Sequence, residues 1–79
     1  MELEMINKKE GNQLEICLKG KLNTNTAPEL KSLLEKELDG TGLLLLDFAD
    51  CDFVSSAGLR VLLNTFKSMK SAGGQMKLL

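Results

Sequence analysis

A chain of 79 residues has room for one domain, and a domain of this size buries only about 60% of the surface that its unfolded chain exposes. Charged residues make up 27% and the formal net charge is −1, which argues against nucleic-acid binding because that function needs a basic patch. Neither a signal peptide nor an apolar run long enough to cross a bilayer is present, so we expect a cytoplasmic protein that binds no membrane.

Reactive side chains are scarce. The sequence has no histidine, so Ser-His and Cys-His nucleophile pairs are excluded and we expect no enzymatic activity, no catalytic residue and no cofactor. Cys17 and Cys51 are too few and too far apart in the sequence for a metal motif, so we expect no metal. We predict that both cysteines are buried small apolar side chains without a disulfide.

The first part of the chain predicts a β-hairpin. Residues 2–7 are mixed in character and indicate an edge strand, and residues 8–13 form a polar turn. Apolar and polar side chains then alternate over residues 14–19, which predicts a half-buried strand that pairs with the first and ends at Gly20.

A loop of small polar side chains and a first helix follow. Thr26 and Glu29 have the spacing of a capping box, with Pro28 in the first turn, where proline is tolerated. The Gly40-Thr41-Gly42 stretch closes the helix. The apolar side chains expected to form its buried stripe are Ala27, Leu30, Leu33, Leu34 and Leu38.

Residues 43–46 are an uninterrupted run of leucine that predicts a strand covered on both faces. The second helix is expected to run from the serine pair to Met69 or Lys70, where residues 71–74 stop it. Residues 75–79 begin a further parallel strand. The stripe of the second helix expected to face the sheet contains Leu59, Leu62, Leu63, Phe66 and Met69.

These elements predict an α/β fold in which an N-terminal β-hairpin leads into a mixed sheet with β-α-β-α-β parallel crossovers. In such a sheet the loop at residues 23–26 and the turn at Ser55 and Ser56 lie at the same carboxyl edge, where open α/β sheets place their sites.

Two adjacent hydroxyls, Ser55 and Ser56, lie where the strand turns into the second helix. Serine is a preferred N-cap because its hydroxyl accepts a hydrogen bond from a free N–H of the first turn. Capping accounts for only one of the two serines, and Gly58 allows close approach to the turn. A phosphate here would meet the positive end of the helix dipole, so the turn is the best candidate for modification or recognition.

The chain resembles the STAS domain family, which includes bacterial anti-sigma factor antagonists and cytoplasmic domains of sulfate transporters. Residues 20–30 carry one part of the resemblance, and residues 44–48 running into residues 53–63 carry the other. The resemblance implies that residues 1–79 form a single STAS domain, short or incomplete, in which the last helix of the family is missing.

In antagonists of this family, the serine two residues before the glycine of a Ser-x-Gly-Leu turn is phosphorylated by a partner kinase, and it corresponds to Ser56. The resemblance therefore implies a phosphorylation-controlled interaction switch. The unmodified protein would bind an anti-sigma factor that is also a serine kinase, and phosphorylation would end that binding. A phosphatase is a further expected partner.

The resemblance also implies a partner-binding surface around the turn. Ser55 and Asn23 each stand where many antagonists carry aspartate, so a negative charge is absent at both positions. Arg60 is expected to pair with an acidic group of the partner or with the phosphate. The expected partner-binding residues are Asn23, Thr24, Asn25, Ser55, Gly58 and Arg60.

Other interpretations remain open at this point. The chain could be an unphosphorylated STAS docking subunit of a transport ATPase complex or signalling scaffold, or a degenerate fragment with structural value only. A nucleotide-binding role is disfavoured because Gly73-Gly74 lacks the surrounding residues of a P-loop. Without the last helix, we also predict a homodimer through the uncovered sheet edge or an apolar face.

Overall fold

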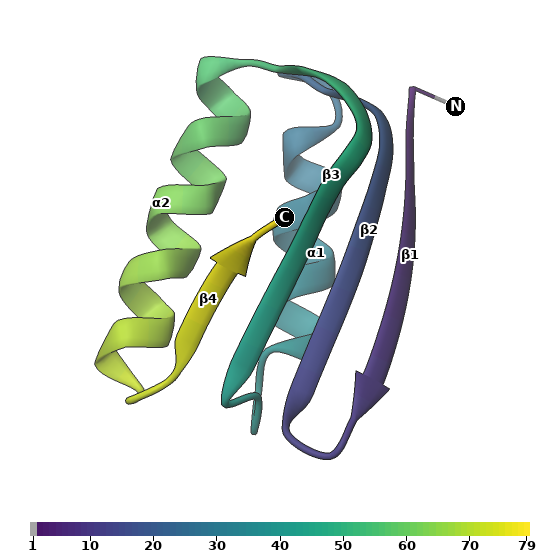
Figure 1. The fold of residues 1–79 in the computed structure, drawn as a ribbon. Helices are drawn as coiled ribbons and strands as arrows, with labels where there is room; N and C mark the ends of the chain where they lie inside the picture. Colours follow the sequence, from purple (N-terminus) through teal and green to yellow (C-terminus); the bar gives the residue numbers. More distant parts are fainter. Residues whose placement is uncertain (1) are drawn as a thin grey trace.

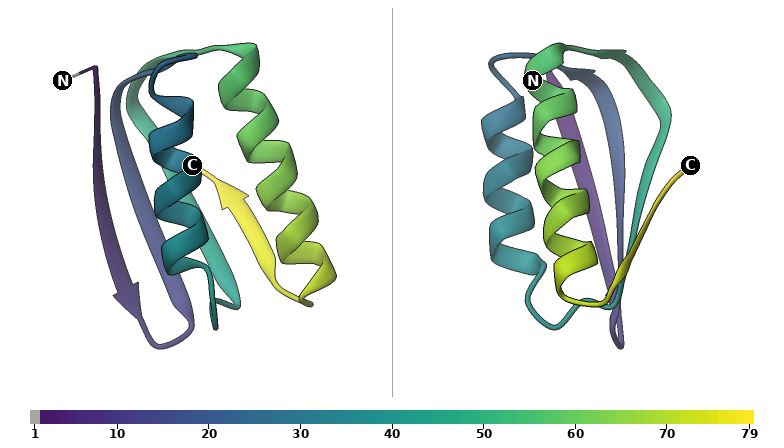
Figure 2. Two further views of the ribbon diagram at one scale, coloured as in Figure 1. Left: turned by 180° about the vertical axis from the view of Figure 1, so that it is seen from behind. Right: turned by 90° about the vertical axis from the view of Figure 1, so that its left-hand side faces the viewer.

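The computed structural model describes residues 2–79 and shows one sheet with two helices packed on the same face (Figures 1 and 2). Neither helix within these residues has the length and apolar composition needed to span a membrane. The elements in chain order are β1 (Leu3–Glu10), β2 (Gln13–Leu22), α1 (Ala27–Glu37), β3 (Leu43–Val54), α2 (Ser56–Ser71) and β4 (Gln75–Leu78).

The four strands lie in the order β1-β2-β3-β4, with β1 antiparallel to β2 and the other neighbours parallel. This confirms the predicted α/β fold with its hairpin and parallel crossovers. Strand β1 extends to Glu10, so the polar turn is shorter than expected. Lys8 pairs with Glu15 across the strands, and opposite charges at such a position favour continued pairing.

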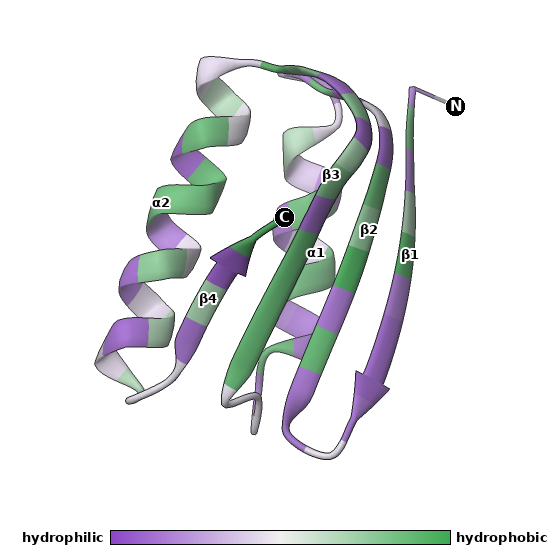
Figure 3. Ribbon diagram, viewed as in Figure 1, coloured by the Kyte–Doolittle hydropathy of each residue, from purple (hydrophilic) through white to green (hydrophobic). Residues whose placement is uncertain are grey.

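The expectation that residues 43–46 are covered on both faces is wrong. Leu44 and Leu46 are fully buried beneath the helices, whereas Leu43 and Leu45 are half-buried on the opposite face. Figure 3 shows this part of β3 as a continuous hydrophobic segment, although only alternate side chains reach the core. The cause is the strand order: successive right-handed crossovers in one direction place both helices on one face.

The two helices differ in how well their predicted stripes are buried. On α1, Ala27, Leu30 and Leu34 are buried and Leu33 and Leu38 pack partly against the core, as expected.

On α2 the prediction is wrong for three of the five residues, because only Leu62 and Met69 are buried. Leu59, Leu63 and Phe66 are 52%, 60% and 47% exposed. Gly58 and Thr65 complete the buried line instead, and this line is narrow because the short edge strand β4 pairs only with residues 43–46 of β3.

Cys17 and Cys51 are both free, and both are half-buried, so the prediction that they are buried is wrong. Cys17 falls between the buried Ile16 and Leu18 and therefore faces the open side of the sheet. The pleat of β2 places alternate side chains on opposite faces, and this placement leaves the Cys17 side chain partly exposed.

Leu44→Ala is expected to lower the free energy of unfolding by about 2–5 kcal/mol, because it leaves a cavity between the sheet and the helices. Leu45→Ala, one residue along and half-buried on the open face, is expected to cost about 1 kcal/mol. Urea titrations of both variants check this difference. Equal losses would indicate that both faces of β3 are covered.

Candidate functional site

The carboxyl ends of β2 and β3 meet at one edge of the sheet, at the top of Figure 1. Leu22 and Val54 are register partners at the ends of these parallel strands, and the Ser55 N–H donates a hydrogen bond of 2.8 Å to the Leu22 carbonyl. The β2–α1 loop and the first turn of α2 therefore lie on the same surface.

The two serines differ in their contacts. Ser55 is the N-cap of α2, with extended backbone, and its Oγ accepts a hydrogen bond of 3.3 Å from the Gly58 N–H. Ser56 is the first residue of the helix, is exposed, and its hydroxyl has no hydrogen-bond partner among residues 2–79. The structure thus assigns capping to Ser55 and leaves the Ser56 hydroxyl free.

Gly58 allows the first turn of α2 to rest directly on the end of β2. A Cβ at this position would lie 2.7 Å from Cγ and 2.9 Å from Cδ2 of Leu22, which is itself fully buried. Any side chain here would push the serine turn away from the β2–α1 loop, so the absence of a side chain fixes the spacing of the two segments.

Asn23 organises the β2–α1 loop. Its Oδ1 accepts hydrogen bonds from the N–H groups of Asn25 (2.9 Å) and Thr26 (3.0 Å), and its carbonyl accepts from Ala27 N–H at 2.8 Å. Asparagine side chains commonly close such turns through their own downstream backbone. Thr24 and Asn25 are exposed at the tip of the loop.

The capping box predicted for Thr26 and Glu29 is wrong. Thr26 is buried, and its Oγ1 donates to the Lys21 carbonyl at 2.7 Å and accepts from the Asn23 N–H at 2.8 Å. Its backbone is already helical at φ −97° and ψ −19°, and its side chain makes no cap hydrogen bond. The hydroxyl therefore joins the start of α1 to the end of β2 and the start of the loop.

Glu2 is a site residue that the sequence analysis missed. Asn23 Nδ2 donates a hydrogen bond of 2.9 Å to Glu2 Oε2, and the Lys21 N–H donates one of 2.8 Å to the Glu2 carbonyl. Gly20, with φ +109°, allows this close approach of the N-terminal residues. Only the hairpin register brings Glu2 here, so no local pattern could have indicated it.

Other candidate sites lie away from this edge. Glu15, Cys17 and Asp47 bring possible metal-ligand atoms within 4.8 Å of one another on the open face of the sheet. Zn²⁺ accepts both carboxylate and thiolate ligands, but this cluster supplies only three such groups, and acidic side chains commonly lie together without an ion.

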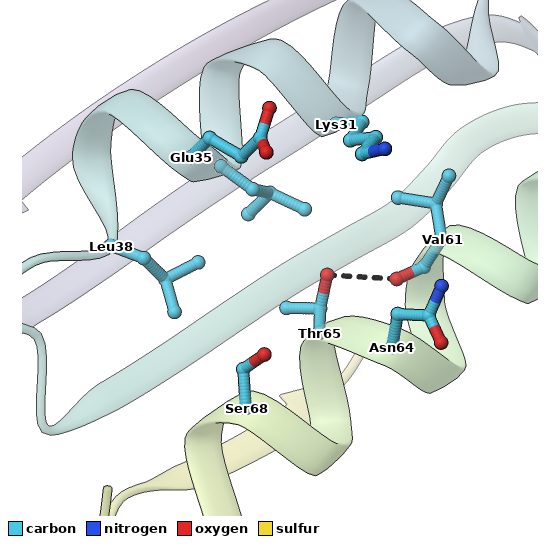
Figure 4. A pocket seen from close by; sticks show the side chains of 8 residues that line it. Lys31, Glu35, Leu38, Val61, Asn64, Thr65 and Ser68 are labelled. Carbon is cyan, nitrogen blue, oxygen red and sulfur yellow. Dashed lines mark hydrogen bonds between the residues drawn. The ribbon is translucent and has the colours of Figure 1, made fainter.

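A pocket of about 190 Å³ lies between α1 and α2, as Figure 4 shows. Leu34, Leu38 and Val61 give it apolar walls, and the Thr65 hydroxyl facing it donates to the Val61 carbonyl at 2.8 Å. Neither Asn23 nor Ser56 lines this pocket.

Comparison with known proteins places this geometry in context. The STAS domain family profile matches residues 5–79. Over 63 residues the chain is 36% identical to BtrV of Bordetella bronchiseptica, provisionally named an anti-sigma factor antagonist, covering 78% of this chain and 54% of BtrV. It is 28% identical over 78 residues to the anti-sigma-B factor antagonist of Bacillus subtilis, covering 99% of this chain and 72% of that protein. The chain therefore spans about half the length of BtrV.

Solved structures agree on the fold. Unphosphorylated SpoIIAA, an anti-sigma factor antagonist, superposes with a TM-score of 0.81 at 14% identity, covering 96% of this chain and 70% of that one. The phosphorylated form of Bacillus SpoIIAA gives a TM-score of 0.80 at 13% identity, covering 92% and 68%.

Asn23→Ala is expected to lower the free energy of unfolding by about 1–2 kcal/mol, because the Asn25 N–H loses its acceptor and the Thr26 N–H keeps only its longer bond of 3.2 Å to the Asn23 carbonyl. Thr24→Ala in the same loop is the matched control and should change it by less than about 0.5 kcal/mol. Urea titration measures both. A loss no larger for Asn23→Ala than for Thr24→Ala would contradict the organising role of Asn23.

Gly58→Ala provides a test in which the sign of the effect is informative. At an unhindered helical position this change stabilises by about 1 kcal/mol. Here it is expected to destabilise by about 1–3 kcal/mol, because the new methyl group meets Leu22. In a Leu22→Ala background, the destabilisation caused by Gly58→Ala should largely disappear. Thermal unfolding of the parent, the two single variants and the double variant measures this difference. Stabilisation by Gly58→Ala in the parent chain would contradict the contact.

Proposed function

This chain belongs to the STAS domain family, and we propose that it is an anti-sigma factor antagonist controlled by phosphorylation at Ser56. In this proposal the unmodified protein binds an anti-sigma factor that is also a serine kinase. Phosphorylation of Ser56 ends the binding, and a phosphatase restores it. The observation that carries the proposal is the difference between the two serines: Ser55 caps the helix, while the Ser56 hydroxyl is exposed and free to react.

The position of Ser56 suits a reversible phosphate. The phosphate adds about −1.5 to −2 charges at the positive end of the α2 dipole, where the first-turn N–H groups of Ser56 and Ala57 lack partners within the helix. Arg60 is exposed four residues further along α2, at the spacing that allows an ion pair with a group on Ser56. Modification therefore changes the surface charge without requiring the fold to open.

The proposed partner-binding surface combines two adjacent segments. Asn23, Thr24 and Asn25 come from the β2–α1 loop, and Ser55, Gly58 and Arg60 come from the start of α2. The Ser55 N–H bond to the Leu22 carbonyl holds these segments together, so one partner can contact both. The names of the two curated relatives support an antagonist role.

Glu2 adds a carboxylate to this surface through its bond to Asn23. A phosphate on Ser56 would increase the negative charge of the same edge. An anti-sigma factor whose contact surface is adapted to the unmodified charge would then be repelled, which is a change in specificity as well as in affinity.

The test is intact mass after incubation with ATP and the anti-sigma factor kinase of the same host. We expect a gain of one phosphate that Ser56→Ala abolishes. Ser55→Ala should still be phosphorylated, although loss of its cap lowers the free energy of unfolding by about 1 kcal/mol. Ser56→Ala should leave unfolding nearly unchanged, because alanine is favourable inside a helix.

Ser56→Ala is thus expected to abolish phosphorylation with little change in stability, whereas Ser55→Ala is expected to lower stability and leave phosphorylation intact. No phosphate gain with a kinase that modifies its reference substrate would contradict the proposal and favour an unphosphorylated docking subunit. Phosphorylation that persists in Ser56→Ala but disappears in Ser55→Ala would move the acceptor to Ser55.

A further inference from the structure

Strand β1 leaves one side of the sheet open. It stands first in the order β1-β2-β3-β4, so within residues 2–79 its backbone bonds to a neighbouring strand on one side only. Its eight residues pair with β2 in an unbroken register, from Leu3 opposite Gly20 to Glu10 opposite Gln13. In the left view of Figure 2, β1 forms the outer edge of the sheet and neither helix extends past it. A regular outer strand of this length can pair with a strand of another chain.

The register with β2 decides which backbone groups of β1 point outward. The Lys21 N–H donates to the Glu2 carbonyl, so these two residues form a hydrogen-bonded pair one step before the pair of Leu3 and Gly20. Hydrogen-bonded and non-hydrogen-bonded pairs alternate along an antiparallel ladder, so residues 4, 6, 8 and 10 bond toward β2. The backbone N–H and C=O groups of residues 3, 5, 7 and 9 therefore point away from the sheet.

The side chains of β1 are complementary to themselves in one antiparallel register. Leu3 is buried beneath the helices, so Glu4, Ile6 and Lys8 lie on the open face, where Ile6 is 44% exposed. A two-fold axis at Ile6 would place this residue opposite its own copy, and Glu4 opposite Lys8 of the other copy on both sides of the axis. These would be non-hydrogen-bonded pairs, in which Cα atoms are about 4.5 Å apart and side chains are closest.

Neighbouring symmetric registers match less well. An axis at Asn7 would place Glu4 opposite Glu10, and an axis at Met5 would place Glu4 opposite Ile6. With the axis at Ile6, the unfavourable pair of Glu2 and Glu10 is confined to the two ends. The Glu2 carboxylate there already accepts a hydrogen bond from Asn23 Nδ2. The charge pattern therefore favours the register centred on Ile6.

We propose that β1 pairs with β1 of a second copy of this chain, antiparallel about a two-fold axis at Ile6, so that one sheet continues through both copies. Outward backbone groups of residues 3, 5, 7 and 9 supply the hydrogen bonds, while Ile6 and the pairs of Glu4 with Lys8 fix the register. Because the strands are antiparallel, the edges that carry Ser56 lie at opposite ends of the dimer. Both remain accessible, so the dimer presents two copies of the candidate site.

Sedimentation equilibrium of the 79-residue chain tests the proposal. A single strand pair buries less surface than a standard interface, so we expect a weak dimer with a dissociation constant in the micromolar range. Asn7→Pro should abolish the dimer and keep the fold, because the Asn7 N–H points outward and proline is tolerated at such edge positions.

Charge exchange distinguishes pairing between copies from effects within one copy. Glu4→Lys and Lys8→Glu should each weaken the dimer about tenfold or more, which corresponds to about 1.4 kcal/mol. The double variant should restore dimerisation, because opposite charges again face each other between the copies. Within one copy, Glu4 lies opposite Lys19 and Lys8 opposite Glu15, so a purely intramolecular effect would make the double variant the least stable of the three.

Matched controls make the same charge changes on another face. Glu29→Lys and Lys36→Glu alter exposed side chains of α1 and should leave the dimer as in the parent chain. Circular dichroism checks that each variant is folded.

A cross-link tests the register directly. In a chain that carries Cys17→Ser and Cys51→Ser, Ile6→Cys should form a disulfide between copies under mild oxidation, because the two copies of this position face each other. Lys8→Cys is the control, because the two copies of position 8 would lie about 14 Å apart. Electrophoresis without reductant should show the covalent dimer for Ile6→Cys and its loss for Lys8→Cys.

Several results would overturn the proposal. These are a monomer up to about 500 µM, far above the expected dissociation constant, a dimer that survives Asn7→Pro, or equal cross-linking of the two cysteine variants. Self-association that Phe66→Ser abolishes and Asn7→Pro does not would place the contact on α2. If Asn7→Pro does not fold, the charge exchange and the cross-link still decide the question. None of these results depends on Ser56, so the phosphorylation proposal stands or fails separately.

Discussion

The contact between Leu22 and Gly58 fixes the geometry on which the candidate site depends. Leu22 ends β2 with a fully buried side chain, and a Cβ on Gly58 would overlap it. The Leu22 carbonyl also accepts the Ser55 N–H, so the same residue anchors the start of α2 by packing and by hydrogen bonding. Two loops that are far apart in the sequence thereby become one surface.

Hydrogen bonding within that surface leaves some polar side chains of the β2–α1 loop and of the first turn of α2 without a partner in the part of the fold that the structure describes. In the β2–α1 loop, the side chains of Asn23 and Thr26 form hydrogen bonds with the backbone, and Asn23 also bonds Glu2. Thr24 and Asn25 are exposed. In α2, Ser55 is committed to the cap and Ser56 is free. A rigid frame that presents a few uncommitted polar groups is what recognition of a partner requires.

The one-sided sheet has consequences at the other end of α2. Because the helices share one face and β4 is a short edge strand, α2 buries only a narrow line of residues and exposes Leu63 and Phe66 beside cationic side chains. The N-terminal turn of α2 carries two serine hydroxyls, whereas its C-terminal half carries exposed apolar side chains beside cationic ones.

Local patterns in the sequence determined the elements, because alternation, helical spacing, glycine stops and the serine pair each reflect short-range geometry. They indicated the hairpin, both helices, the parallel strands and the edge that carries Ser56. Tertiary structure decided what depends on neighbours distant in sequence. The crossover direction left one sheet face open, the short β4 left part of α2 exposed, and the hairpin register brought Glu2 to Asn23. The Thr26 hydroxyl donates to the Lys21 carbonyl of β2, a contact that the spacing of Thr26 and Glu29 could not reveal.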